Sequence, residues 1–174
     1  MSPTTARHVV ESLGPDADVL VLDGGPSDVG IESTVVDASD AVPVILRPGG
    51  IAREAIADAC GVAPVLHGTV RDTLAGGAPR ADDDATPRSA PGMLARHYAP
   101  RARIVLVPAG DTGAMRAAVA DARAAHGDAV GVLAHSAIPL DAGSVVVEAM
   151  PGEAEGYARR LYAALHAMDA RGVR

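Results

Sequence analysis

The feature that most constrains the fold is a break in character near the middle of this 174-residue chain. Residues 68–88 hold a Gly-Gly pair, two prolines and the acidic triplet at 82–84, a composition typical of an exposed connector. On both sides, short apolar runs alternate with stretches of helical periodicity. We therefore predict two globular units joined by a linker. The acidic triplet is interpreted as solvated, because a metal site needs more convergent ligands.

The N-terminal part predicts helices and strands in alternation. Ser2 and Pro3 are typical of an N-cap and a first helical position, and Gly14 ends this helix. A second, short helix is stopped by Gly61. Apolar runs predict strands, the first of them buried, at residues 18–22, 31–36, 42–46 and 62–66.

The C-terminal part shows the same alternation. Strands are expected at residues 104–107, 129–134 and 144–148. One helix precedes the second of these strands, with Met115 and Val119 on its apolar face, and an amphipathic helix capped by Gly172 closes the chain. The pattern predicts an α/β protein with a mainly parallel sheet and helices on its faces.

Composition excludes several classes of chemistry. All 15 basic residues are Arg, so a Schiff-base lysine and a phosphate-loop lysine are absent. Without Phe or Trp, and with three Tyr, the chain offers no evident stacking platform for single-stranded nucleic acid. A net charge of −7 disfavours charge-driven binding to nucleic acid or to anionic membrane.

Cysteine and histidine usage argues against a metal centre. The single cysteine, Cys60, excludes internal disulfides and multi-Cys zinc sites, and we expect it to be a buried structural thiol. Five histidines lie scattered as surface or packing residues, without metal-ligand spacing: His8, His67, His126, His135 and His166. No apolar run approaches the ~20 residues of a membrane span, and no signal peptide is visible, so we expect a cytoplasmic protein.

Three clusters could carry chemistry. Ser33 and Thr34 place neighbouring hydroxyls in an apolar strand, where adjacent residues point to opposite faces. Arg47 ends another apolar strand before Pro48 and a Gly-Gly pair, and its planar fork of donors matches carboxylate or phosphate. The residues alone leave alternatives open. Thr34 could merely suit a strand, Ser33 could hydrogen-bond to the backbone, and Arg47 could be a surface residue before a turn.

The third cluster lies in the connector itself. Residues 90–100 pack Arg96, His97 and Tyr98 side by side, with Pro at 91 and 100 and Gly92 between them. Because Pro and Gly restrict or redirect the backbone, these polar side chains are expected to hold a defined pose. The segment is a candidate lid over a ligand, or an ordered linker whose His and Tyr pack against the units.

Taken in order, these segments closely resemble the Sua5/YrdC family of L-threonylcarbamoyladenylate synthases. The resemblance rests on the Ser-Pro-Thr-Thr-Ala start, Asp-Gly-Gly-Pro at 23–26, residues 30–37, residues 46–50, and Pro-Gly-Met at 91–93 with His-Tyr-Ala-Pro at 97–100. It implies a partial YrdC-like twisted-sheet domain over residues 1–67, a linker over 68–102, and a small Rossmann-like Sua5 domain over 103–174 that is truncated at its end.

The resemblance also implies a reaction. Family members condense L-threonine, bicarbonate and ATP into threonylcarbamoyl-AMP with release of pyrophosphate, and ATP chemistry implies Mg²⁺. The product passes to the machinery that makes threonylcarbamoyladenosine at position 37 of tRNA. On matched positions, Ser33 and Thr34 look like substrate- or nucleotide-contacting hydroxyls, Arg47 like a cation for carboxylate or phosphate, and His97 with Tyr98 like a lid over ATP. No general base and no metal ligand is identified.

Two departures from the family pattern set a further expectation. The upstream basic motif, with its Lys and Arg, and the Ser-Ala-Asn motif are both missing. We therefore expect the chain to be a fragment that is inactive or severely impaired alone. A non-catalytic nucleotide-binding or regulatory module, an RNA-binding module, and assembly with a second polypeptide that supplies the missing half remain the alternatives.

Overall fold

The computed structural model describes residues 1–68, 70, 99–136 and 145–174. These residues form two compact units, one of Met1–Gly30 with Pro100–Arg174 and one of Ile31–Ala99. Both units combine helices with short strands, so the predicted α/β class is confirmed. No helix in the described residues is long and apolar enough to cross a membrane.

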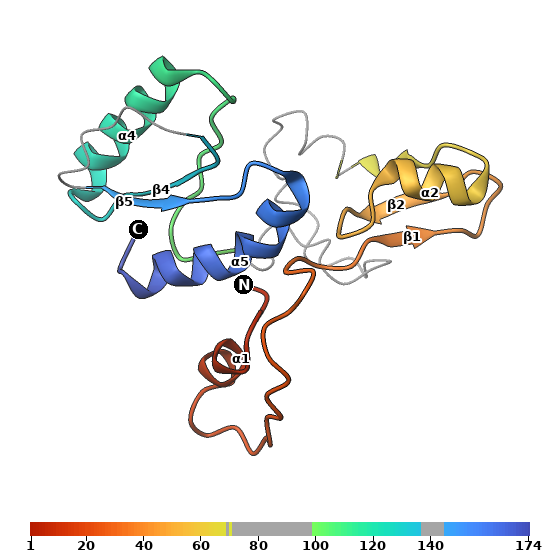
Figure 1. Ribbon diagram of the computed structural model, residues 1–174, viewed down its shortest axis with the longest axis horizontal. Coiled ribbons are helices and arrows are strands. Elements are labelled where there is room, and N and C mark those ends of the chain that lie inside the picture. The colour runs from red at the N-terminus through yellow and green to blue at the C-terminus, as the bar shows by residue number, and fades with distance from the viewer. Residues whose placement is uncertain (69, 71–98, 137–144) are drawn as a thin grey trace. The chain divides into compact units, whose positions relative to one another are not determined.

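The unit Ile31–Ala99 is built on a three-stranded sheet ordered β1-β2-β3 (Figure 1). Its elements are β1 (Val35–Asp37), β2 (Val44–Arg47), α2 (Arg53–Cys60) and β3 (Val65–Leu66). Strand β2 pairs antiparallel with β1 and parallel with β3, and α2 forms the crossover that a parallel pair requires. The central strand supplies the buried Ile45 and Leu46.

Helix α2 shows how the sequence sets its own limits. Gly61 follows it in the left-handed conformation, φ 69°, which ends the helix as predicted. Arg53 Nε donates to the Pro64 carbonyl at 2.8 Å and ties the helix to the chain entering β3. The expected burial of Cys60 is wrong: the thiol is exposed, because α2 buries none of its residues.

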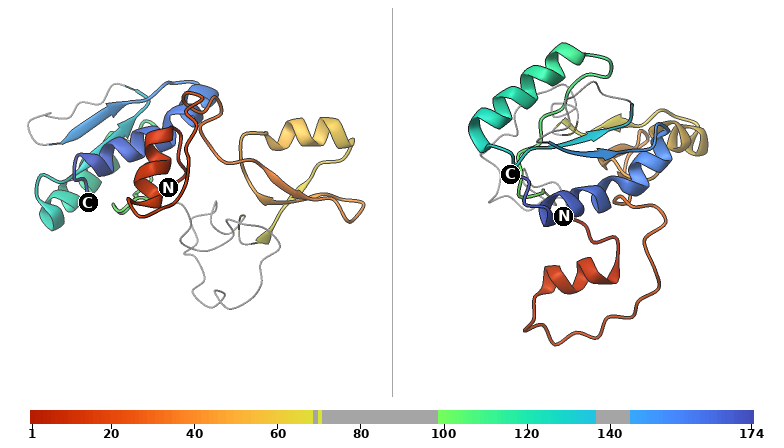
Figure 2. Two further views of the ribbon diagram at one scale, coloured as in Figure 1. Left: turned by 90° about the horizontal axis from the view of Figure 1, so that it is seen from below. Right: turned by 60° about the vertical axis from the view of Figure 1, so that its left-hand side comes forward.

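The other unit contains a parallel pair of strands between two helices. Strands β4 (Gly131–Ala134) and β5 (Val146–Ala149) are parallel, and α4 (Thr112–His126) and α5 (Ala154–Ala170) lie on opposite sides of them (Figures 1 and 2). The buried apolar residues are Val130, Met150, Ala164, Met168 and Val173. This core forms where α5 covers one face of the strands.

Helix α1 (Ala6–Leu13) begins later than predicted. Thr5, and not Ser2, is the N-cap: its hydroxyl accepts from His8 N at 3.3 Å. Ser2 and Thr4 are instead buried and engaged by side chains of His166 and His8, which keeps the segment before Thr5 out of the helix. The predicted end at Gly14, φ 81°, is confirmed.

Two predicted strands do not form. Residues 18–22 lack strand structure and leave Leu20 and Leu22 each 86% exposed, and residues 104–107 leave Leu106 91% exposed. Both runs have strand composition, but a strand also needs a neighbour for its backbone groups. No strand in the described residues pairs with either run.

Candidate functional site

The candidate site centres on the guanidinium of Arg47. This residue ends β2 opposite Val35, where the β1–β2 pairing is irregular. Arg47 Nε donates to the Ser33 carbonyl at 3.1 Å, and Nη2 donates to Ser33 Oγ at 3.0 Å. Nη2 also lies 3.6 Å from Glu32 Oε2. Because the Arg47 side chain is only 15% exposed, these contacts hold a charged head in a defined orientation.

Thr34, directly before β1, joins the Ser33 segment to the turn that follows Arg47. Its hydroxyl donates to the Ile51 carbonyl at 2.8 Å and accepts from Ile51 N at 3.1 Å. One residue earlier in the turn, Gly50 N donates to the Glu32 carbonyl at 2.9 Å. The neighbouring hydroxyls of Ser33 and Thr34 therefore serve different partners, one the Arg47 head and the other the turn backbone.

Gly49 permits this close approach of the two segments. A Cβ built on Gly49 would lie closer than 3.0 Å to backbone atoms of Glu32, Ser33 and Thr34. Backbone cannot rotate away as the end of a flexible side chain can. Glycine is therefore required at position 49, because no room is left for a Cβ atom.

Replacing Gly49 by alanine should separate the turn from the strand and disorder the Arg47 head. We expect a loss of about 2 kcal/mol in free energy of unfolding, typical of overpacking. Gly68→Ala is the matched control, because a Cβ there would meet nothing within 4 Å. Urea denaturation of both variants measures the difference. Equal stability of the two variants would show that the strand and turn are not in contact.

The sequence predicted part of this cluster. The structure brings together Ser33, Thr34 and Arg47, while His97 and Tyr98 lie outside the described residues. Glu32 was not singled out, although its carboxylate, 27% exposed, partly balances the Arg47 charge. The available signal was its place directly before the two hydroxyls. The alternation rule for strands could not show on which side Glu32 lies, because the regular strand β1 begins only at Val35 and Glu32 precedes it.

A cavity of about 230 Å³ lies in the other unit. Residues 3–6 form one wall, and Asp23, Gly24 and Gly25 belong to the segment opposite. Asp23 Oδ1 accepts from Gly25 N at 2.9 Å, which fixes the Asp-Gly-Gly turn. Hydroxyls and backbone supply its polar lining, while Val9, Val21 and Leu22 add apolar surface, so the lining is of mixed character.

Two of the histidines that were predicted to be scattered lie side by side, as packing residues. The rings of His8 and His166 stack with centroids 3.8 Å apart. Burial lowers the pKa of His8, and the neighbouring His166 ring lowers it further. Among the described residues, no group of three or more His, Cys, Asp and Glu side chains could hold a metal ion.

Comparison with known proteins decides the family. The model described as "Threonylcarbamoyl-AMP synthase, C-terminal domain" matches residues 51–174, and the Sua5/YciO/YrdC model, described as "Telomere recombination", matches residues 1–49. The chain belongs to the Sua5 family. Two family models thus match two successive regions of this chain, in the order that the sequence motifs predicted.

Named Sua5 relatives and solved structures agree. A threonylcarbamoyl-AMP synthase of Pyrococcus abyssi is 34% identical over 99% of this chain, and one of Bacillus subtilis is 40% identical over 60% of it. The crystal structure of P. abyssi Sua5 complexed with L-threonine matches 99% of the chain at 33% identity, with a TM-score of 0.75. A P. abyssi Sua5 variant with an adjacent His and Tyr replaced by Ala matches with a TM-score of 0.74.

The match covers only part of each relative. The chain spans 46% of the length of the P. abyssi protein and 27% of the B. subtilis protein.

Proposed function

We propose that this chain forms part of a threonylcarbamoyl-AMP synthase, which condenses L-threonine, bicarbonate and ATP and releases pyrophosphate. One observation carries the proposal: nearly the whole chain matches the fold of P. abyssi Sua5 complexed with L-threonine at 33% identity. The activity is that of a nucleotidyltransferase, since AMP is transferred to a carboxylated threonine. Its product would serve the machinery that makes threonylcarbamoyladenosine in tRNA.

Arg47 is the proposed cationic group of the site. The reaction develops negative charge on phosphate and carboxylate oxygens, which positioned donors stabilise better than water does. Hydrogen bonds to the Ser33 carbonyl and hydroxyl already orient the Arg47 fork before any ligand binds. We assign Ser33 to direct contact with substrate or nucleotide. Thr34 assists by fixing the turn that follows Arg47.

His97 and Tyr98 are the proposed lid over ATP. The P. abyssi variant replaces an adjacent His and Tyr, and this chain contains one such pair, His97-Tyr98. Closing a lid would exclude water from the labile carboxylated intermediate. The His97 and Tyr98 side chains would donate hydrogen bonds to the negatively charged nucleotide.

Mg²⁺ would reach the site with the nucleotide. Because the described side chains form no ready metal cluster, they do not fit a resident ion. Mg²⁺ commonly binds substrate phosphates and keeps several waters. We therefore derive no step from a protein-held metal.

We propose the sequence division at residues 1–67, 68–102 and 103–174 as catalytic part, linker and Sua5 domain. The separate family matches to 1–49 and 51–174 support a division into two regions, although they meet near residue 50 and not at residue 67 or 102. A cytoplasmic location is proposed with it.

Threonine-dependent pyrophosphate release from ATP and bicarbonate tests the proposal. The chain is assayed alone and with any coding sequence read in frame upstream, and threonylcarbamoyl-AMP is identified by mass. We expect product only from the extended form, because the upstream basic and Ser-Ala-Asn motifs are missing here. Product in neither form would favour a nucleotide-binding module, and product from the short chain would show that the essential site is misplaced.

A further inference from the structure

A pair of stacked histidines joins the two ends of the chain. His8 lies on α1 and His166 on α5, with ring centroids 3.8 Å apart and planes inclined by 17°. His166 Nε2 also lies 3.1 Å from the Ser2 carbonyl oxygen. His8 belongs to the region of the Sua5/YciO/YrdC match, and His166 to that of the C-terminal domain match. The contact therefore connects two regions that are matched by different family models.

The hydrogen-bond partners fix where the ring protons lie. A carbonyl oxygen only accepts, so His166 Nε2 must carry the proton that it donates to Ser2. A backbone N–H only donates, and Thr4 N lies 3.2 Å from His8 Nδ1. His8 Nδ1 must therefore be unprotonated, with the Thr4 hydroxyl 3.1 Å from the same nitrogen. The arrangement requires a neutral His8.

The two rings hold one wall of the cavity. Ser2 and Thr4 are buried, and both are bound by a histidine. Residues 3–6, which follow Ser2 and include Thr4, line the cavity together with the Asp-Gly-Gly turn. Displacing the rings would loosen this segment by removing the contacts to Thr4 N and to the Ser2 carbonyl, although Ser27 N would still donate to the Thr4 carbonyl at 2.9 Å.

We propose that His166 is a positioning residue for the Ser-Pro-Thr-Thr wall of this cavity, and that protonation of His8 releases the wall. The proposal goes beyond the proposed function and stands on the contacts alone. It connects α5, which lies in the region of the C-terminal domain match, with a cavity lined by residues of the Sua5/YciO/YrdC match. A charged His8 would lose its lone pair at Nδ1 and would face the His166 ring.

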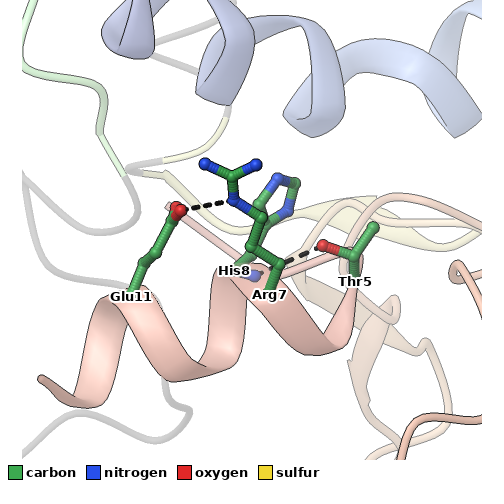
Figure 3. A network of polar contacts seen from close by, with 4 residues as sticks. All are labelled: Thr5, Arg7, His8 and Glu11. Atoms are coloured by element: carbon green, nitrogen blue, oxygen red, sulfur yellow. Dashed lines mark hydrogen bonds and ion pairs between the residues drawn. The ribbon is translucent and has the colours of Figure 1, made fainter. Parts of the chain in front are cut away.

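Neighbouring charges shape this response. Arg7 and Glu11 on α1 and His166 on α5 act on the charge of His8. Glu11 favours the charged form, but its carboxylate is paired with Arg7 Nε at 2.6 Å; Figure 3 shows that pair on the helix that carries His8. Burial is the largest cause of the lowered pKa, followed by His166, while Arg7 also lowers it.

The sign of the pH dependence follows. A lowered pKa means that the folded state binds a proton less readily than the unfolded state does. The stabilisation from neutral His8 is therefore fully present above the ordinary value of 6.5 and is lost as pH falls through the lowered pKa. We expect the wall to be held near pH 7.5 and released only once the pH falls below the lowered pKa of His8.

Hydrogen exchange of the Thr4 amide tests the proposal without any assay of activity. In the unmodified chain, we expect its protection factor to fall about fivefold as the pH is lowered stepwise from 7.5 through the pKa of His8, typical of losing one hydrogen bond. His8→Asn keeps an acceptor near Nδ1 but cannot be protonated, so its protection should stay constant over the same pH series. His166→Gln keeps an amide donor but no ring, so protection should fall at pH 7.5. His126→Ala, on exposed α4 surface, is the matched control and should change nothing.

Three results would overturn the inference. Unchanged Thr4 protection in His166→Gln would remove the positioning role. Persistent pH dependence in His8→Asn would remove the switch. Nitrogen-15 spectra of the rings give a check that needs no variant: a protonated His8 Nδ1 or an unprotonated His166 Nε2 near pH 7.5 contradicts the arrangement. Since none of these readouts needs turnover, failure here is distinct from failure of the synthase proposal.

Discussion

Replacing Arg47 by alanine should lower kcat/KM for threonylcarbamoyl-AMP formation by about 10²–10³-fold, the loss typical of removing one preorganised donor at a developing charge. The effect should be large because the guanidinium is already oriented by Ser33 and Glu32, so little ordering remains at the moment of reaction. The loss should appear mainly in kcat if the cation meets charge that develops in the transition state. Initial-rate kinetics of pyrophosphate release, in the form of the protein that makes product, measures it.

Two further variants separate charge from geometry at this position. Arg47→Lys keeps the charge but loses the planar fork, so it should recover only a small part of the activity. Arg123→Ala serves as the control, because Arg123 is a half-exposed residue of α4 whose partner is Asp128 at 3.4 Å. Its kinetics should match the unmodified protein. Full activity in Arg47→Lys would reduce Arg47 to a point charge, and full activity in Arg47→Ala would remove it from the site.

Local signals explain which elements could be predicted from the sequence. Helix α2 ends where predicted because Gly61 provides the left-handed conformation that a helix end uses. Helix α4 similarly follows from its apolar spacing and from Asp111, whose carboxylate caps the helix by accepting from Ala114 N at 2.8 Å. Such elements depend on a few neighbouring residues, so no distant contact is needed to find them.

Long-range contacts explain what could not be predicted. The runs 18–22 and 104–107 have strand composition, but whether a strand forms depends on a partner that composition does not reveal. The start of α1 was misplaced for the same reason, since His166 holds Ser2 from the other end of the chain. Residue spacing cannot indicate a contact over such a separation.

The candidate site likewise has features that are visible locally in the sequence and features that depend on long-range contacts. Ser33, Thr34 and Arg47 were identifiable because polar side chains interrupt apolar strands, which is locally visible. Their mutual contacts arise from the pairing of β1 with β2, and this pairing brings Glu32 to Arg47. The irregularity between Val35 and Val36 is part of that arrangement and leaves no mark in the hydrophobic pattern.

Gly30→Ala should be the most destabilising glycine-to-alanine substitution in the unit of Met1–Gly30 with Pro100–Arg174, and it should lower the free energy of unfolding by about 3 kcal/mol or more. Two causes act together: Gly30 has φ 74°, which an L-residue adopts only at a cost of 1–2 kcal/mol, roughly, and its Cβ would overlap backbone atoms of Arg159 on α5. Neither the buried glycine nor the helix backbone can move aside locally.

Gly110→Ala isolates the first cause. Gly110 has nearly the same φ, 81°, but nothing lies within 4 Å of its built Cβ, so it should lose only about 1 kcal/mol. Urea denaturation of both variants gives the difference, which measures the close approach of Gly30 to α5. Equal destabilisation would mean that Gly30 and Arg159 are apart in solution. A larger loss at Gly30 would show that α5 holds the chain at Gly30, two residues before Glu32, as the His8–His166 pair holds the start of the chain.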